Sequence, residues 1–463
     1  MSDVLRMESD SLGTIEVPAE ALWGAGTARA LAAYRISGQP MPPGLLQALA
    51  RIKRAAARAN AELGQLDPGL AQAIATAATR VVEGELLEQF PIDRYQTGSG
   101  TATNMNMNEV LASLANEALG GQRGDKSPVH PNDHVNRGQS SNDTVPTAIH
   151  LAAALAIDGQ LLPALRRLHL ALRDRAQALS GVLVSGRTHL MDATPIRLDQ
   201  VIGGWARQVE KGLSRVESAR GALMELALGG TAVGTGMGRH PELSQRAIAL
   251  LAEETGLPLV EARDHFEAQS AMDSALEAHA QLEVLASSLL KIAGDLRLYA
   301  SGPRSGLGEL RLPALAPGSS IMPGKINPVM CEVVCQVAAR VIGNGSSIRV
   351  AASFGQLQLH TGMPLLASAL LESVELLAQA SHSFAAQAIE GLSADEARCR
   401  ASLERNLSLA TALLPTLGYD AATAVAREAF HRDLSVREVL REQGWSEEAV
   451  DRVLEVEGMT GVG

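Results

Sequence analysis

The architecture of this chain is most readily inferred from one short polar segment and the patterns on either side of it. Residues 318–328 read GSSIMPGKINP, and they separate two long stretches with helical periodicity, 272–300 and 328–351. The glycines and prolines of the segment predict a shaped loop that continues neither helix. Taken alone, its Ser-Ser-x-x-x-x-Lys pattern fits an ordinary flexible connection equally well.

Long helical patterns fill most of the chain around this loop. They cover residues 147–179, 195–228, 272–300, 328–351 and 363–389, with a bend expected at Pro163. Helices of about 25 to 35 residues would be about 40 to 50 Å long, and helices of that length normally pack in bundles. Alanine and leucine cover many of their faces, which predicts burial against other subunits as well. We therefore expect a mostly α-helical protein with a central long-helix bundle.

The two ends of the chain differ from this middle. An extended segment is predicted at 14–18, helices begin near Leu45, and Asp67-Pro68 has the pattern of a helix N-cap followed by proline. From about Leu392 the helical patterns are shorter and more charged. We expect three domains: a mixed, mainly helical domain over 1–140, the bundle over 141–391, and a small helical domain over 392–463.

The composition argues against several classes of function. The net charge of −11 disfavours general nucleic-acid binding, although a local cationic cradle can still hold an anion. Three cysteines are too few for a disulfide framework or for the four thiolates of an iron–sulfur cluster. The chain begins without a basic-then-apolar leader pattern and has no uninterrupted apolar run long enough to cross a membrane, so the expected location is the cytoplasm.

Three more polar stretches interrupt the helical patterns, at 97–108, 130–142 and 186–192. Small hydroxyl and amide side chains crowd them, which is typical of loops that contact a ligand. Each also has an ordinary interpretation, as capping and turn residues or, for 186–192, as a turn between two long helices. Helix is expected to resume at Glu109 after the first stretch.

Metal and nucleotide sites have weaker support. His130, Asp133 and His134 lie close together but without a standard zinc spacing, and buried free thiols are commoner than a metal pair at Cys331 and Cys335. Residues 97–101 lack the Gly-x-x-x-x-Gly-Lys pattern of a phosphate loop. The glycine-rich segment GGTAVGTG, residues 229–236, follows a helix, which disfavours a dinucleotide site. No metal site is expected.

Together these stretches resemble the fumarase/aspartase superfamily and, within it, the class II fumarate hydratases. Segment 318–328 is similar to the superfamily signature G-S-S-x-M-P-x-K-x-N-P, and the resemblance extends over essentially the whole chain. It implies a three-domain fold whose central bundle joins four copies into a homotetramer, with each active site built from loops of three chains. It implies a small dicarboxylate substrate, no cofactor, no nucleic-acid or membrane partner, and a place in the tricarboxylic acid cycle.

The resemblance also implies roles for individual residues. Ser319 would be the base, Lys325 would stabilise it and hold a carboxylate, and His189, oriented by Glu332, would protonate the departing hydroxyl. Substrate-binding groups would be Ser99, Thr101, Ser140, Ser141, Asn142, Thr188, Lys325 and Asn327. A second dicarboxylate site near the entrance would be formed by His130, Asn132 and Asp133.

His189 favours water over ammonia, because aspartases resemble this segment but carry Gln at that position. The expected reaction is the reversible hydration of fumarate to (S)-malate, by anti addition and elimination of water through an aci-carboxylate. The alternative is an aspartate ammonia-lyase, or a lyase for another substituted succinate. It rests on a departure from the usual fumarase pattern: residues 355–361 read GQLQLHT in place of G-N-F-E-L-N-V, which is closer to aspartases. Gly26 and Ala28, where the family usually has Gln, are further departures. An inert scaffold would need decayed catalytic positions, and these are intact.

Overall fold

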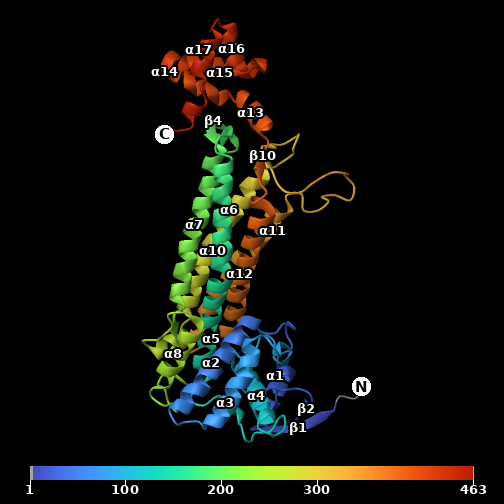
Figure 1. Ribbon diagram of the computed structural model, residues 1–463, viewed down its shortest axis with the longest axis vertical. Helices are drawn as coiled ribbons and strands as arrows, with labels where there is room; N and C mark the ends of the chain where they lie inside the picture. Colours follow the sequence, from blue (N-terminus) through green and yellow to red (C-terminus); the bar gives the residue numbers. More distant parts are fainter. Residues whose placement is uncertain (1–3, 462–463) are drawn as a thin grey trace. The chain divides into compact units, whose positions relative to one another are not determined.

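The computed structural model describes residues 4–461 and is mostly helical, as expected (Figure 1). Within that range the strands form five two-stranded sheets. The chain divides into two compact units. The first unit holds the chain up to Pro163 together with Ser214–Ala286 and Ala339–Ala378, and the second holds Ala164–Leu213, Ser287–Ala338 and the chain from Gln379 onward. The three-domain division at residues 140 and 391 stays a prediction.

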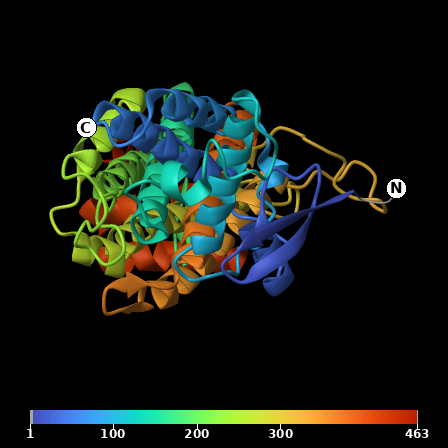
Figure 2. The ribbon, with the colours of Figure 1, turned by 90° about the horizontal axis from the view of Figure 1, so that it is seen from below.

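The first unit is built mainly from the N-terminal part of the chain. Its N-terminal strands form an antiparallel hairpin, and α1 packs against both this hairpin and α4 (Figure 2). Its elements are β1 (Leu5–Asp10), β2 (Gly13–Pro18), α1 (Ala25–Ala33), α2 (Pro43–Glu62), α3 (Pro68–Val82), α4 (Thr101–Ala118), α5 (Ser141–Ala156), β5 (Glu225–Leu226), α8 (Leu243–Thr255), β6 (Val260–Glu261), α9 (His265–Ser270), β8 (Gly355–Gln356) and β9 (Leu359–His360).

Two of the local sequence signals in this unit are confirmed. Leu45, Leu49 and Ile52 are fully buried on one side of α2. The Asp67 carboxylate accepts hydrogen bonds from the backbone N–H groups of Gly69 and Leu70, at 2.8 and 3.1 Å, and so caps α3. An aspartate at this position satisfies backbone donors that the helix itself leaves unpaired.

The second unit carries a β-hairpin and the C-terminal helices. Its elements are α6 (Leu162–Ala178), β3 (Leu183–Thr188), β4 (Met191–Arg197), β7 (Leu310–Arg311), β10 (Ser393–Ala394), α13 (Glu396–Glu404), α14 (Leu414–Leu417), α15 (Tyr419–Arg432), α16 (Val436–Glu442) and α17 (Glu447–Val453). The C-terminal helices share a hydrophobic cluster that includes Leu409, Leu413, Val425, Val439 and Val450.

Four long helices contribute residues to both units: α7 (Leu198–Ala222), α10 (Asp273–Tyr299), α11 (Val329–Ala352) and α12 (Met363–Phe384). Partly buried polar contacts hold neighbouring helices together in each unit. In the second unit Trp205 Nε1 on α7 donates to Asp295 of α10 at 3.1 Å, and in the first Asn344 of α11 donates to Glu372 of α12 at 2.8 Å. The predicted bundle of long helices is thereby confirmed (Figure 1).

Pro163 marks an irregularity in the helix predicted over 147–179. α5 ends at Ala156, one π-helical turn follows over Ile157–Leu161, and α6 begins at Leu162. Proline has no N–H to donate and its ring crowds the preceding turn, so the wider π turn accommodates it within a continuous helix.

Two helical stretches, Ser141–Ala178 and Met363–Ile389, are long and apolar enough by composition alone to cross a membrane. Within the protein, however, 61% and 72% of their most apolar windows are buried. This burial is the pattern of core helices, and length and hydropathy by themselves carry little weight here.

Candidate active site

The first group of predicted site residues lies in the first unit, where α4 and α5 begin. Gly100, with φ of 73°, forms the left-handed turn before α4. The Ser99 and Thr101 hydroxyls lie 2.9 Å apart, and the Thr101 hydroxyl lies 2.8 Å from that of Ser141 on α5. The structure thus brings two of the polar stretches together in one row of hydrogen-bonded hydroxyl groups.

Helix α4 begins earlier than expected, at Thr101 and not at Glu109, so most of the predicted polar loop is helical. Ser140, Ser141 and Asn142 likewise form the N-terminus of α5. Ser140 caps that helix: its hydroxyl accepts from the Asn142 N–H at 3.2 Å, and its own N–H donates to Asp143 at 2.9 Å. A helix N-terminus lined by hydroxyls suits a carboxylate, because the helix dipole is positive there.

A buried lysine that the sequence analysis did not single out connects these stretches. Lys53 Nζ donates to the side-chain oxygens of Asn136 at 2.8 Å and Gln139 at 3.1 Å. The amides of Asn104 and Asn108 donate to the same Asn136 oxygen, at 3.3 and 3.2 Å. Complete burial lowers the pKa of Lys53 to about 7. These asparagine side chains therefore support the segments that carry the hydroxyl groups.

The second group lies on the β3–β4 hairpin of the second unit. This corrects the expected helix–helix turn: residues 186–192 span the tip of two paired strands. His189 and Leu190 both have positive φ, 56° and 63°, which non-glycine residues rarely adopt. Thr188 and His189 are exposed at this tip.

Interactions at the base of the hairpin hold that tip in place. Arg187 makes two hydrogen bonds of 2.7 and 2.8 Å to the Glu309 carboxylate, which is completely buried. Asn406 donates to the Ser185 hydroxyl at 3.0 Å and to the Ala193 carbonyl at 2.7 Å. The strained residues therefore project from a firmly anchored support, as expected where backbone strain has a functional use.

The third group lies on the 318–328 loop, which joins the segment after β7 to α11. The loop closes on itself, because the Gly318 N–H donates to the Lys325 carbonyl and the Asn327 amide donates to the Gly318 carbonyl, both at 2.8 Å. The Ser319 oxygen accepts hydrogen bonds from the backbone N–H groups of Ile321 and Met322, at 3.1 and 2.9 Å. Two donors on one hydroxyl oxygen stabilise negative charge there.

Lys325, Asn327 and Glu332 line one cavity of about 470 Å³ in the second unit. Arg297 of α10 lines it too and is a cation that the sequence analysis missed. No local motif marks Arg297; only the packing of α10 beside the loop reveals it. The cavity holds two cations and one carboxylate, a composition that suits an anionic ligand.

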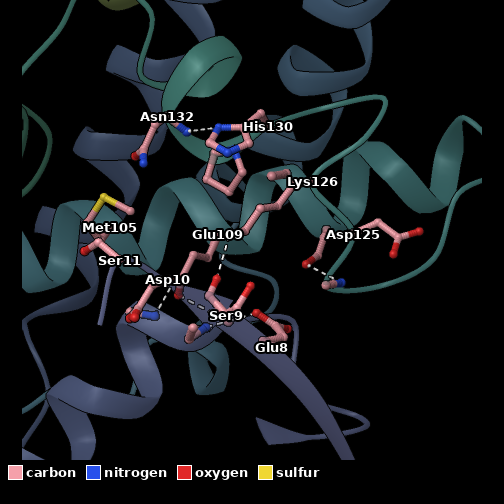
Figure 3. Close-up of a pocket in the computed structure, with 17 residues that line it drawn as sticks. Glu8, Ser9, Asp10, Ser11, Met105, Glu109, Asp125, Lys126, His130 and Asn132 are labelled. Atoms are coloured by element: carbon pink, nitrogen blue, oxygen red, sulfur yellow. Dashed lines mark hydrogen bonds between the residues drawn. The ribbon is translucent and has the colours of Figure 1, made fainter. Parts of the chain in front are cut away.

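His130 and Asn132, predicted to bind a second dicarboxylate, line a different cavity of about 350 Å³ in the first unit (Figure 3). His130 Nδ1 accepts from the backbone N–H of Asn132 at 3.1 Å. Glu8, Asp10 and Glu109 line the same cavity, so its charge is mostly negative. Asp133 lies outside this lining, with 73% of its side chain exposed.

The sequence departures lie near two of the predicted sites: Gly26 lines the cavity of His130 and Asn132, and residues 355–361 lie near the first group. Gly26 donates its N–H to Glu109 at 2.8 Å, and a Cβ at this position would lie only 2.8 Å from that carboxylate. Residues 355–361 form the small β8–β9 hairpin, whose Thr361 carbonyl would lie 2.1 Å from a Cβ on Gly98. The β8–β9 hairpin, whose sequence differs from the family pattern, thus packs directly behind the loop that carries Ser99.

Residues 4–461 contain no group of three or more His, Cys, Asp or Glu side chains placed to hold a metal ion. Cys331 and Cys335 lie on α11 as free thiols, and burial raises the pKa of Cys331 to about 12. A thiol in that state is a poor metal ligand, because the thiolate is the ligating form.

Comparisons with known proteins show the family to which the chain belongs. A family model described as "Lyase" matches residues 13–343, and one described as "Fumarase C C-terminus" matches residues 409–461. The chain belongs to this lyase family. The curated relatives that it matches over nearly their full length include class II fumarate hydratases.

Two of these relatives illustrate the similarity. The protein from Halobacterium salinarum is 51% identical over 461 residues, which cover 99% of this chain and 98% of the relative. That from Nitrosomonas europaea is 48% identical over 443 residues, 96% of each chain.

Solved structures agree as well. The fumarate lyase:delta crystallin from Brucella melitensis bound to cobalt has a TM-score of 0.95 and 41% identity, covering 99% of this chain and 100% of its own. The class II fumarase from Schistosoma mansoni has a TM-score of 0.95 and 36% identity, covering 99% of each chain. The expected fold class is confirmed.

Proposed function

We propose that the protein catalyses the reversible hydration of fumarate to (S)-malate. The observation that carries this proposal is the arrangement of the 318–328 loop, in which two backbone N–H groups point at the Ser319 oxygen. The full-length similarity to class II fumarate hydratases supports the same reaction.

The chemistry of dehydration explains why the loop needs this arrangement. A proton next to a carboxylate is weakly acidic, and its removal places a second negative charge on that carboxylate as an aci form. A serine is a competent base only if its alkoxide is stabilised, and here the N–H groups of Ile321 and Met322, together with Lys325, supply that stabilisation. Lys325 and Asn327 also hold the substrate carboxylates.

Hydroxide is a poor leaving group and must be protonated as it departs. A histidine performs this near neutral pH, and His189 is held exposed at the hairpin tip for that role. Glu332, in the cavity with Lys325, orients His189 and stabilises its protonated form. Ser99, Thr101, Ser140, Ser141, Asn142 and Thr188 donate the neutral hydrogen bonds to the substrate.

The three groups meet, in this proposal, in a homotetramer whose sites each use three chains. Large apolar side chains on the catalytic segments support it: Leu190 and Met191 at the hairpin tip are 74% and 70% exposed, and Ile321 on the loop is 86% exposed. Leu298 on α10 and the α11 residues Val333 and Ile342 are also exposed. Apolar surface of this extent is typical of subunit interfaces.

We propose further that the protein needs no cofactor, acts in the tricarboxylic acid cycle and is located in the cytoplasm. The last point is supported by the three free thiols, which suit a reducing compartment. In this proposal His130, Asn132 and Asp133 form a second dicarboxylate site. We expect it to be the weaker site, because the cavity that His130 and Asn132 line is rich in carboxylates.

A second candidate is an ammonia-lyase acting on aspartate or another substituted succinate. The β8–β9 hairpin favours this second candidate. Its sequence differs from the usual fumarase pattern, and it packs behind Gly98 and thus behind the loop that carries Ser99.

One experiment separates the two. The purified protein is incubated with fumarate and ammonium together, and the products are identified by NMR. Malate alone supports hydration; aspartate as the main product would reject it in favour of the lyase.

A further inference from the structure

The glycine-rich loop at 229–236 touches the substrate-binding end of α5. We propose that Gln269 is a positioning residue for Asn142, acting through Thr231 and Ala232 of this loop. The inference rests on the proposed function, in which Asn142 binds a substrate carboxylate.

Three hydrogen bonds join the loop to the start of α5. The Asp143 carboxylate accepts from the N–H groups of Gly229 at 3.1 Å and Thr231 at 2.9 Å. The Asn142 side-chain amide donates to the carbonyl of Ala232 at 2.8 Å. The loop is therefore bonded directly to Asn142 and to its completely buried neighbour Asp143.

Gln269 on α9 fixes the loop from the other side. Its amide donates to the Thr231 carbonyl at 2.7 Å, and its side chain is completely buried. A Cβ on Gly230 would lie 2.1 Å from Gln269 Oε1, so this contact requires glycine there. Gly230 therefore serves the approach of Gln269 and needs no nucleotide to explain it.

The conformation of the loop is costly, which argues that it has a use beyond stability. Thr231 has φ of 56°, a value that β-branched residues rarely adopt. Thr231 Oγ1 and Gln269 Oε1 are both buried without a hydrogen-bond partner among residues 4–461. Strain and unpaired polar atoms of this kind concentrate where a fold maintains a functional geometry.

The geometry suggests how the effect reaches the substrate. An asparagine amide has two N–H groups, and the Ala232 carbonyl engages Nδ2 through one of them. The plane of the amide is thereby fixed, and the second N–H remains available for a carboxylate. Gln269 holds the carbonyl of Thr231, which belongs to the peptide group joining Thr231 to Ala232.

The test compares Gln269→Leu with the wild type, using fumarate turnover and competitive inhibition by succinate, which cannot react. We expect KM for fumarate and the inhibition constant for succinate to rise about tenfold, the loss of one hydrogen bond to a charged group, with kcat within about twofold. Ser373→Ala is the matched control, since Ser373 is equally buried and bonds His279 in the same unit. It should leave both constants unchanged.

A double-mutant cycle identifies the route. In an Asn142→Ala background, Gln269→Leu should raise KM no further, because the residue acts through Asn142. Additive effects, a wild-type KM in Gln269→Leu, or an equal rise in Ser373→Ala would each overturn the inference. If Gln269→Leu does not fold, Gln269→Met removes the amide donor while keeping a long, unbranched side chain, and it is judged by the same outcomes. Failure of the wild type to consume fumarate would instead overturn the proposed function.

Discussion

A serine hydroxyl acts as a base only where its alkoxide is stabilised, and Ser319 shows how a short loop achieves this. Two backbone N–H groups converge on its oxygen, and the loop that supplies them is closed by Asn327. Lys325 lies exposed on the same loop, where it can reach an anion.

His189 provides a test of the leaving-group chemistry at the same scale. His189→Asn should lower turnover by about 10²- to 10⁴-fold, the usual contribution of a general acid. Asparagine tolerates the φ of 56° found here, so the hairpin should keep its conformation.

Steady-state kinetics and circular dichroism on the same preparation check this. Leu190→Asn is the matched control at the neighbouring strained position. Equal losses in both variants would show that the hairpin conformation, and not the imidazole, is being measured.

Lys53 makes a pH dependence of stability testable. Its pKa is about 7 in the folded protein, lowered by burial from 10.5. Between pH 7 and pH 10.5 the Lys53 amine binds its proton more tightly in the unfolded chain than in the folded protein. The contribution of Lys53 to stability is therefore lowest below pH 7 and rises toward pH 10.

The free energy of unfolding of the wild type, measured relative to Lys53→Met, should therefore increase from pH 7 to pH 9.5. Urea titrations at the two pH values measure it. A difference that is constant or falls with pH would contradict the buried, weakly basic lysine.

Among the elements, the β3–β4 hairpin was not predicted from the sequence. Its strands are short, and they lie between long helical patterns, so periodicity alone extended the helix to Pro195. What defines the hairpin is distant in the chain: the ion pair from Arg187 to Glu309 and the hydrogen bonds from Asn406.

That ion pair yields a stability prediction for the element. Arg187→Met should lower the free energy of unfolding by about 3 to 5 kcal/mol, because it leaves the buried Glu309 carboxylate unpaired. Arg405→Met, which breaks an exposed pair with Asp433, should change stability little. Chemical denaturation measures both, and comparable losses in the two variants would be inconsistent with a special role for the buried pair.

The helices show where sequence patterns suffice. α10, α11 and α12 match their predicted ranges closely, since their apolar periodicity is long and uninterrupted. α4 begins at Thr101, eight positions before the predicted Glu109. Threonine and asparagine have low helix propensity, but Asn104 and Asn108 gain hydrogen bonds to Asn136 that a local pattern cannot reveal.

The site residues divide in the same way, into those that a local sequence pattern reveals and those that only the fold reveals. The 318–328 loop is a continuous segment, so its residues could be identified from sequence. Lys53, Arg297 and Gln269 belong to no motif, because each acts on residues far away in the chain.

For the whole molecule, the proposal makes every active site depend on several chains. Inactive variants that fail at different groups should then complement one another. Mixed tetramers of Ser319→Ala and His189→Asn chains should recover activity, since some sites take the intact Ser319 and the intact His189 from different chains.

With random mixing, about a quarter of the sites would be intact in a symmetric tetramer. Each variant alone should stay inactive, and light scattering should report four chains for all samples. A mixture no more active than its components would mean that one chain supplies both residues.

The most direct test of the central claim is the loss of the ultraviolet absorbance of fumarate on addition of the purified protein, without added metal or cofactor. We predict steady consumption by the wild type, with Ser319→Ala slower by at least about 10²-fold at the same concentration and with the same oligomeric state. A folded wild type that leaves fumarate unchanged, or a Ser319→Ala variant that consumes it at the wild-type rate, would contradict the account.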